Sequence, residues 1–195
     1  MNSFEKYQPV SLSQIVFAQP AVKQDLMDYA TGVATNNILL HGEFGTGKTT
    51  IAKAIANQRC NSEEVLLFNA KSGVKLSLEK LRNQTNWNLI NGDSSLFIVD
   101  EVDRFSANAQ DEIVCFVDEF KNYGGMFIFT TNYLDKVDRA LKSRCSTYHI
   151  KCLTPSQALP TAKQILLAEG VSFESDAWLL QQLELAVEVT SKASD

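Results

Sequence analysis

A glycine-rich segment between an apolar run and a helical stretch constrains the fold of this 195-residue chain more than any other feature. The segment Gly42-Glu43-Phe44-Gly45-Thr46-Gly47-Lys48-Thr49 matches the pattern GxxxxGK[ST] at every fixed position. It follows the apolar run Asn37–His41 and opens the stretch Lys48–Gln58, whose composition favours a helix. A strand, this loop and a helix, in that order, indicate a phosphate-binding loop. The alternative is a tight turn that matches the pattern by chance, and the flanking strand and helix argue against it.

The chemistry of this loop suits a nucleoside triphosphate bound together with Mg²⁺. Its glycines allow successive backbone N–H groups to curve around phosphate oxygens, and the N-terminus of the following helix adds positive potential. We expect Lys48 to reach the outer phosphates and the Thr49 hydroxyl to ligate Mg²⁺. ATP and Mg²⁺ are therefore the expected cofactors. The expected nucleotide-binding residues are Gly42, Glu43, Phe44, Gly45, Thr46, Gly47, Lys48, Thr49 and Thr50.

Short apolar runs alternate with helical stretches along the first 150 residues. The runs are continuous rather than alternating, as expected when helices cover both faces of a parallel sheet. Strand, helix, strand, helix predicts an α/β domain, and a shorter fifth strand is expected to include Thr147–Ile150. The other strands are expected at Asn37–His41, Val65–Phe68, Ser95–Val99 and Met126–Thr130, and the helices at Ala21–Thr31, Lys48–Gln58, Ser77–Leu89 and Asn108–Phe120.

The pattern changes after Ile150, where two helical stretches follow without strands. Thr154 is a suitable N-cap for a helix over Pro155–Ala168, and Gly170 can end that helix. A second helix is expected over Ser175–Val189, with an apolar stripe that includes Trp178, Leu179, Leu183 and Ala186 or Val187. We therefore expect a nucleotide-binding α/β domain over residues 1–150 and a partial helical lid over residues 151–195.

Two carboxylates follow the predicted strand that ends at Val99. Asp100 and Glu101 would lie at the carboxyl ends of the parallel strands, where ligands bind in open α/β sheets. Asp100 is expected to hold the Mg²⁺ shell, and Glu101 to orient and deprotonate the water that attacks the γ-phosphate. Acidic pairs after strands are often solvated turn residues. Their combination with the phosphate loop favours the catalytic interpretation.

Two further residues are candidates for the same chemistry. Asn132 follows the strand expected at Met126–Thr130 and can position the attacking water or sense the γ-phosphate, although Asn is also common as a turn residue at strand ends. Arg144 precedes the fifth strand and can stabilise charge on a transferring phosphoryl group, usually in a neighbouring subunit of a ring ATPase. An isolated Arg is more often a surface charge.

Composition and charge exclude several other classes of protein. The net charge of −5 argues against a surface that coats nucleic acid, so any DNA contact must be local or shared with partners. The four cysteines form no CxxC pair, so their spacing suggests neither a zinc site nor a disulfide framework. The chain has no apolar stretch near the roughly 20 residues needed to cross a bilayer and does not begin like a signal peptide, so we expect no membrane partner and a cytoplasmic location.

Together these residues resemble the AAA+ family and, within it, the ATPase subunits of sliding-clamp loaders of the replication factor C type. The resemblance covers Glu5 to about His149. The motifs that carry it are Glu5–Pro9 with Leu12–Val16, Phe68-Asn69-Ala70, the acidic box Asp100–Asp103, Thr131-Asn132 as the first sensor, and Ser143-Arg144-Cys145 as the arginine finger.

The resemblance implies a P-loop AAA+ domain with a five-stranded parallel sheet, followed by a partial helical lid. It implies an ATPase that opens a ring-shaped clamp and releases it on primer-template DNA. The implied partners are other clamp-loader subunits in a ring-like hetero- or homo-oligomer, the sliding clamp, and primer-template DNA. The alternatives are another AAA+ replication or recombination ATPase, such as a helicase motor or initiator, and a scaffold that binds ATP without hydrolysing it.

Some details depart from the common pattern of clamp loaders. Gln8 stands where the family prefers Arg, and Asp111 and Glu112 lie where basic residues commonly follow DNA phosphates, which puts DNA binding by that helix in doubt. The chain ends within the expected lid, as a fragment or a reduced relative would. The acidic box with Arg104 and an early Ser most resembles the small subunit of T4-like phages, which act in the host cytoplasm. By the same resemblance Lys75 is either a switch that couples DNA to Glu101 or a solvated lysine.

Overall fold

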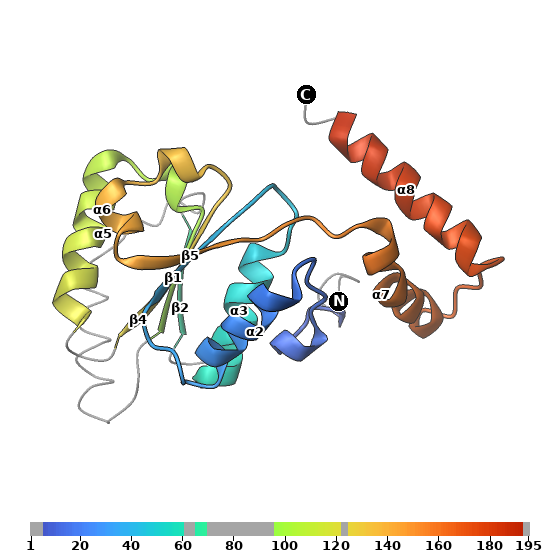
Figure 1. Cartoon of the computed structure of the whole chain (residues 1–195), viewed down its shortest axis with the longest axis horizontal. Helices are drawn as coiled ribbons and strands as arrows, with labels where there is room; N and C mark the ends of the chain where they lie inside the picture. Colours follow the sequence, from blue (N-terminus) through green and yellow to red (C-terminus); the bar gives the residue numbers. More distant parts are fainter. Residues whose placement is uncertain (1–5, 61–64, 70–95, 122–124, 193–195) are drawn as a thin grey trace.

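A five-stranded parallel sheet forms the centre of the computed structural model, which describes residues 6–60, 65–69, 96–121 and 125–192 (Figure 1). The strands lie in the order β2-β3-β4-β1-β5, and every neighbouring pair is parallel. The five-stranded α/β architecture expected from the sequence is therefore confirmed. The strands are β1 (Asn37–His41), β2 (Val65–Asn69), β3 (Leu96–Asp100), β4 (Met126–Thr131) and β5 (Cys145–His149).

Helices cover both faces of the sheet. Helices α2 (Pro20–Ala30) and α3 (Lys48–Arg59) lie on one face, and α5 (Ala107–Phe120) and the short α6 (Arg139–Lys142) lie on the other (Figure 1). Successive residues of a strand point to opposite faces, so Ile38 and Leu40 join one core while Leu39 joins the other. Both faces of the inner strands are thus buried, which explains their continuous apolar sequences. Short 3₁₀ helices add η1 (Leu12–Gln14), η4 (Val102–Arg104) and η6 (Leu134–Lys136).

An aromatic cluster holds α5 against the sheet. The Phe97 ring on β3 lies 5.6 Å from that of Phe116 and 6.4 Å from that of Phe120, both on α5, as measured between ring centroids. It also stacks on Phe127 of β4 at 4.8 Å. Phe97 and Phe116 are almost fully buried. These contacts fix α5 on the sheet over its last turns.

Strand β5 contains Thr147–His149 as expected, but it ends before Ile150. It covers Cys145–His149, because its backbone pairs with β1 from Cys145 opposite Asn37 to His149 opposite His41. This edge strand is only partly buried. Its first residues, Cys145 and Ser146, are small, so they give little apolar signal in the sequence. The other described strands and helices begin and end within three residues of their predicted bounds. The helix expected at Ser77–Leu89 lies outside the described residues.

After the sheet, the chain forms two helices that pack on each other, α7 (Pro155–Ala168) and α8 (Asp176–Lys192) (Figure 1). The Thr154 hydroxyl accepts a hydrogen bond from the Gln157 backbone N–H, as expected for the N-cap of α7. Gly170 adopts a φ of 69° just beyond that helix. The division of the chain into residues 1–150 and 151–195 stays a prediction. In the described part of the chain, no helix has both the length and the apolar character needed to cross a membrane.

The aromatic cluster yields a stability prediction. Replacing Phe97 with Ala should lower the free energy of unfolding by about 3–5 kcal/mol, because it leaves a cavity between β3 and α5. Chemical denaturation monitored by circular dichroism measures this change. Phe44→Ala is the matched control, since the Phe44 ring is largely exposed, and it should cost about 1 kcal/mol or less. A similar loss for both variants would contradict the prediction.

Candidate functional site

Three of the predicted motifs lie together at the edge of the sheet that is formed by the carboxyl ends of its strands. The phosphate loop follows β1, the acidic box begins at the end of β3, and Asn132 follows β4. Because the strands are parallel, their carboxyl ends share one edge of the sheet. The residues proposed from the sequence therefore lie together, with the exception of Arg144, which precedes β5 and lies toward the opposite edge.

The phosphate loop is shaped by two of its glycines. Gly47 caps α3 with a φ of 86°, a left-handed conformation that a side chain disfavours. At Gly42 an added Cβ would lie 2.2 Å from the backbone oxygen of Ile150. The start of the loop thus passes directly against the segment that leaves β5 for α7. A larger residue at position 42 would push these two segments apart.

Lys48 is buried at the centre of the loop. Its Nζ donates hydrogen bonds to the backbone oxygens of Gly42 at 2.9 Å and Glu43 at 2.6 Å, and to Thr46 Oγ1 at 3.3 Å. Burial lowers the pKa of this ammonium below its usual range, while the carboxylate of Asp100 opposes the shift. The loop therefore folds around a cation, which suits it to neutralise an incoming phosphate.

Asp100 is held by hydroxyl groups from two other elements. Its Oδ1 accepts hydrogen bonds from Thr49 Oγ1 at 2.7 Å and from Thr130 Oγ1 at 2.5 Å. Asp100 as a whole residue is 8% exposed. A carboxylate and a hydroxyl are the hard oxygen donors that Mg²⁺ takes from proteins when phosphates and waters complete its shell. Thr49 and Asp100 therefore fit a magnesium ion.

Glu101 adopts a strained backbone conformation beside Asp100. Its φ of 54° and ψ of 52° are left-handed, which is uncommon for a residue with a side chain and often marks a functional site. Its backbone N–H donates to Thr130 Oγ1 at 3.0 Å, and its Oε2 lies 3.0 Å from Arg104 Nε. Thr130 thus fixes the backbone of Glu101, and Arg104 forms an ion pair with its side chain.

The sequence missed the roles of Thr130 and Asp103. Asp103 Oδ1 accepts hydrogen bonds from Thr131 Oγ1 at 2.7 Å and from the Asn132 backbone at 3.3 Å. These bonds tie the acidic box to the end of β4, so Asn132 has a fixed backbone. The sequence feature that could have revealed these roles is the pair Thr130-Thr131 at the carboxyl end of β4, the strand next to β3. Hydroxyl groups at that position can reach the carboxylates that follow β3.

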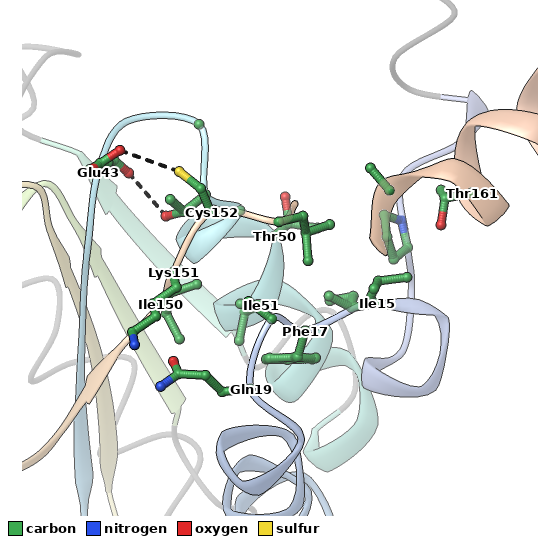
Figure 2. Close-up of a pocket in the computed structure, with 18 of the residues that line it drawn as sticks. Ile15, Phe17, Gln19, Glu43, Thr50, Ile51, Ile150, Lys151, Cys152 and Thr161 are labelled. Atoms are coloured by element: carbon green, nitrogen blue, oxygen red, sulfur yellow. Dashed lines mark hydrogen bonds between the residues drawn. The ribbon is translucent and has the colours of Figure 1, made fainter. Parts of the chain in front are cut away.

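A mainly apolar cavity of about 780 Å³ lies beside the phosphate loop (Figure 2). The walls are formed by the segment before α2, by the loop and the start of α3, by the end of β5 and by α7. Its volume lies in the range of small-ligand and cofactor sites. Ile15 and Val16, from the motif Leu12–Val16 that supports the family resemblance, contribute to its wall, and Thr50 does too. Cys152 Sγ approaches Glu43 Oε2 at 3.4 Å on its rim (Figure 2).

Arg144 is separated from its own phosphate loop by the length of β1. In the register of β5 and β1, Cys145 is opposite Asn37 and His149 is opposite His41, so Arg144 is level with the start of β1. The loop begins only after β1 ends. At about 3.3 Å per residue, roughly 15 Å of strand separate the two. Arg144 instead pairs with Asp118 of α5.

Comparison with known proteins assigns the chain to a family. Residues 38–151, more than half of the chain, match the family "ATPase family associated with various cellular activities (AAA)", and the chain belongs to that family. It is 27% identical over 88% of its length to replication factor C subunit 5 of Mus musculus. It is 28% identical over 89% of its length to the replication factor C small subunit of Thermofilum pendens.

The chain spans about half the length of these curated relatives, 52% and 54% respectively. Among solved structures, the Thermotoga maritima RuvB Holliday junction branch migration motor matches 89% of this chain and 58% of its own, with a TM-score of 0.66 and 20% identity. The replication initiator DnaA bound to AMPPCP and single-stranded DNA matches 95% of this chain and 66% of its own, with a TM-score of 0.64 and 18% identity. These structures share the fold.

The surroundings of His41, the last residue of β1 next to the phosphate loop, predict a change in its pKa when Lys48 is replaced. Its ring stacks on that of His149 at 4.7 Å, and burial, followed by the charges of His149 and Lys48, lowers the pKa of His41 below 6.5. Lys48→Ala removes a positive charge, which favours the protonated ring, so the pKa of His41 should rise. NMR titration of the two histidine rings measures it. Lys53→Ala, farther along α3, is the control and should leave it unchanged. An unchanged pKa in Lys48→Ala would contradict the site geometry.

Proposed function

We propose that this chain is an ATPase subunit of a sliding-clamp loader, which uses ATP and Mg²⁺ to open a clamp and load it on primer-template DNA. The observation that carries the proposal is the division of the site between the two edges of the sheet. The phosphate loop, Asp100 and Glu101 lie at the carboxyl ends of the strands, while Arg144 lies before the start of β5, toward the opposite ends. Such a chain supplies most of one hydrolytic site itself, and its Arg144 can supply the cation that the site of a neighbouring subunit lacks. The similarity to replication factor C subunits supports the same function.

In this proposal each residue of the convergent edge has one task. Lys48 neutralises the outer phosphates, and Thr49 and Asp100 hold Mg²⁺, which supplies further neutralisation of phosphate charge. Glu101 takes the proton of the attacking water, and Asn132 orients that water. The apolar cavity beside the loop receives the nucleoside.

The assembly follows from the separation of Arg144 from its own loop. Arg144 completes the site of a neighbouring subunit in a ring-like hetero- or homo-oligomer, whose other partners are the clamp and the DNA. The exposed acidic residues Asp111 and Glu112 of α5 argue that DNA is held mainly by other surfaces. By the resemblance of Asp100–Arg104, we propose a small subunit of the T4-like phage type, acting in the host cytoplasm. Lys75, the candidate switch, and Ala70 of the segment Phe68-Asn69-Ala70 lie outside the described residues.

Glu101→Gln should separate ATP binding from ATP hydrolysis. The variant keeps the size of the side chain but loses the base, so turnover should fall by roughly two or more orders of magnitude while ATP still binds. Turnover is measured in the complete assembly with primer-template DNA and the clamp of the same replication system. Glu112→Gln, an exposed change on α5, is the control and should leave turnover near the parent value. Equal turnover for Glu101→Gln and the parent would remove Glu101 from the catalytic role.

The action of Arg144 in a neighbouring site can be tested by mixing variants. Arg144→Ala should leave the ATP affinity of the single chain unchanged and remove the stimulation by assembly, since a finger supplied by a neighbour is worth roughly 10³ to 10⁵ in rate. Lys48→Ala should also be inactive, because it does not hold ATP.

A mixture of the two variants should regain ATPase activity. Its Lys48→Ala subunits still donate Arg144, and its Arg144→Ala subunits still bind ATP. Turnover of the mixture is compared with that of each variant alone at the same total concentration. If the mixture assembles and stays inactive, Arg144 does not complete a neighbouring site.

A further inference from the structure

Arg144 is held in a fixed orientation by a carboxylate of α5. Arg144 Nε donates to Asp118 Oδ1 at 2.7 Å, and Arg144 Nη2 donates to Asp118 Oδ2 at 2.7 Å. Two parallel hydrogen bonds of this kind fix both the position and the plane of a guanidinium. Nη1 donates to the backbone oxygen of Ala140 in α6 at 2.8 Å. The side chain is therefore held from two elements.

These contacts leave part of the guanidinium available. A guanidinium has five N–H groups, and the hydrogen bonds to Asp118 and Ala140 engage three of them. Asp118 occupies the side formed by Nε and Nη2, so the edge between Nη1 and Nη2 points away from its carboxylate. The Arg144 side chain is 32% exposed. The remaining N–H of Nη1 and the remaining N–H of Nη2 can therefore donate to an oxyanion while the ion pair with Asp118 stays intact.

Asp118 lies on a part of α5 that is packed firmly against the sheet. Its neighbours Phe116, Val117 and Phe120 are buried against the sheet, whereas the Asp118 side chain is 51% exposed. The paired hydrogen bonds to Arg144 lower the pKa of the Asp118 carboxyl below its usual range, so it stays ionised around neutral pH. A charged carboxylate on a packed helix can orient a cation with little motion.

We propose that Asp118 is a positioning residue, which orients Arg144 so that the guanidinium edge between Nη1 and Nη2 meets a phosphate group bound by an adjacent subunit. This inference rests on the proposed function, since it requires that Arg144 acts in a neighbouring site. Asp118 does not touch the phosphate. It acts by restricting the Arg144 side chain to few conformations, so that less conformational entropy is lost when Arg144 meets the phosphate.

The first experiment replaces Asp118 in the complete assembly. Asp118→Asn keeps the size of the side chain but loses the charge and one acceptor oxygen, so kcat for ATP should fall about ten- to a hundredfold. The KM for ATP and the ATP affinity of the single chain should stay unchanged, because the variant's own phosphate loop is intact. Asp118→Glu, which keeps the carboxylate, should recover much of the loss. Asp111→Asn is the control, the same change at an exposed position of α5, and should have no effect.

A purely structural role for Asp118 would give a different result. An exposed ion pair contributes little to folding stability, so the thermal midpoint of Asp118→Asn should equal that of the parent. A kcat within twofold of the parent overturns the inference. A higher kcat also overturns it, since it would mean that Asp118 restrains Arg144 rather than presenting it.

The second experiment places the change in a chosen subunit of the mixed assembly. Asp118→Asn is added either to the Lys48→Ala chain, which donates Arg144, or to the Arg144→Ala chain, which binds ATP. Activity should fall only when Asp118→Asn is in the donating chain. Equal activity in both arrangements overturns the inference while leaving the role of Arg144 intact. If the mixture without Asp118→Asn is already inactive although it assembles, the proposed action of Arg144 fails, and this inference fails with it.

Discussion

The hydrogen bonds to Asp100 join the three elements on which the rest of the site depends. Asp100 ends β3, and its Oδ1 accepts bonds from Thr49 at the start of α3 and from Thr130 on β4. Thr130 in turn fixes the backbone of Glu101. One oxygen atom therefore sets the position of the proposed magnesium ligands, and its hydroxyl partner Thr130 sets that of the proposed base. The low exposure of Asp100 makes these bonds strong, since little water competes for them.

Helix α5 connects this edge to the opposite one. It begins shortly after the acidic box, is packed on the sheet through the Phe97 cluster, and carries Asp118 near its end. In the proposed function, α5 links the proposed nucleotide site near its start to Asp118, the partner of Arg144, near its end. The aromatic packing of Phe97 against Phe116 and Phe120 holds this helix on the sheet.

The sequence predicted the strands and helices well where their signals are local. The apolar runs of β1, β3 and β4, the glycines of the phosphate loop and the Thr154 cap of α7 each depend on residues close together in the chain. The inclusion of Ile150 in β5 was wrong, because a half-buried edge strand takes its limits from its pairing with β1. The importance of Thr130 and Asp103 was also missed, since their partners are set by the order of the strands.

The sequence by itself determined that this chain folds as an α/β domain with a phosphate loop and a pair of carboxylates after a buried strand. These features follow from spacing, periodicity and the conformational freedom of glycine, all of which act over a few residues. Only the tertiary structure decided that Thr130 holds Asp100 and that Asp118 holds Arg144 a strand length from the loop. These pairs are 30 and 26 residues apart in the chain, so strand order, register and helix packing bring them together.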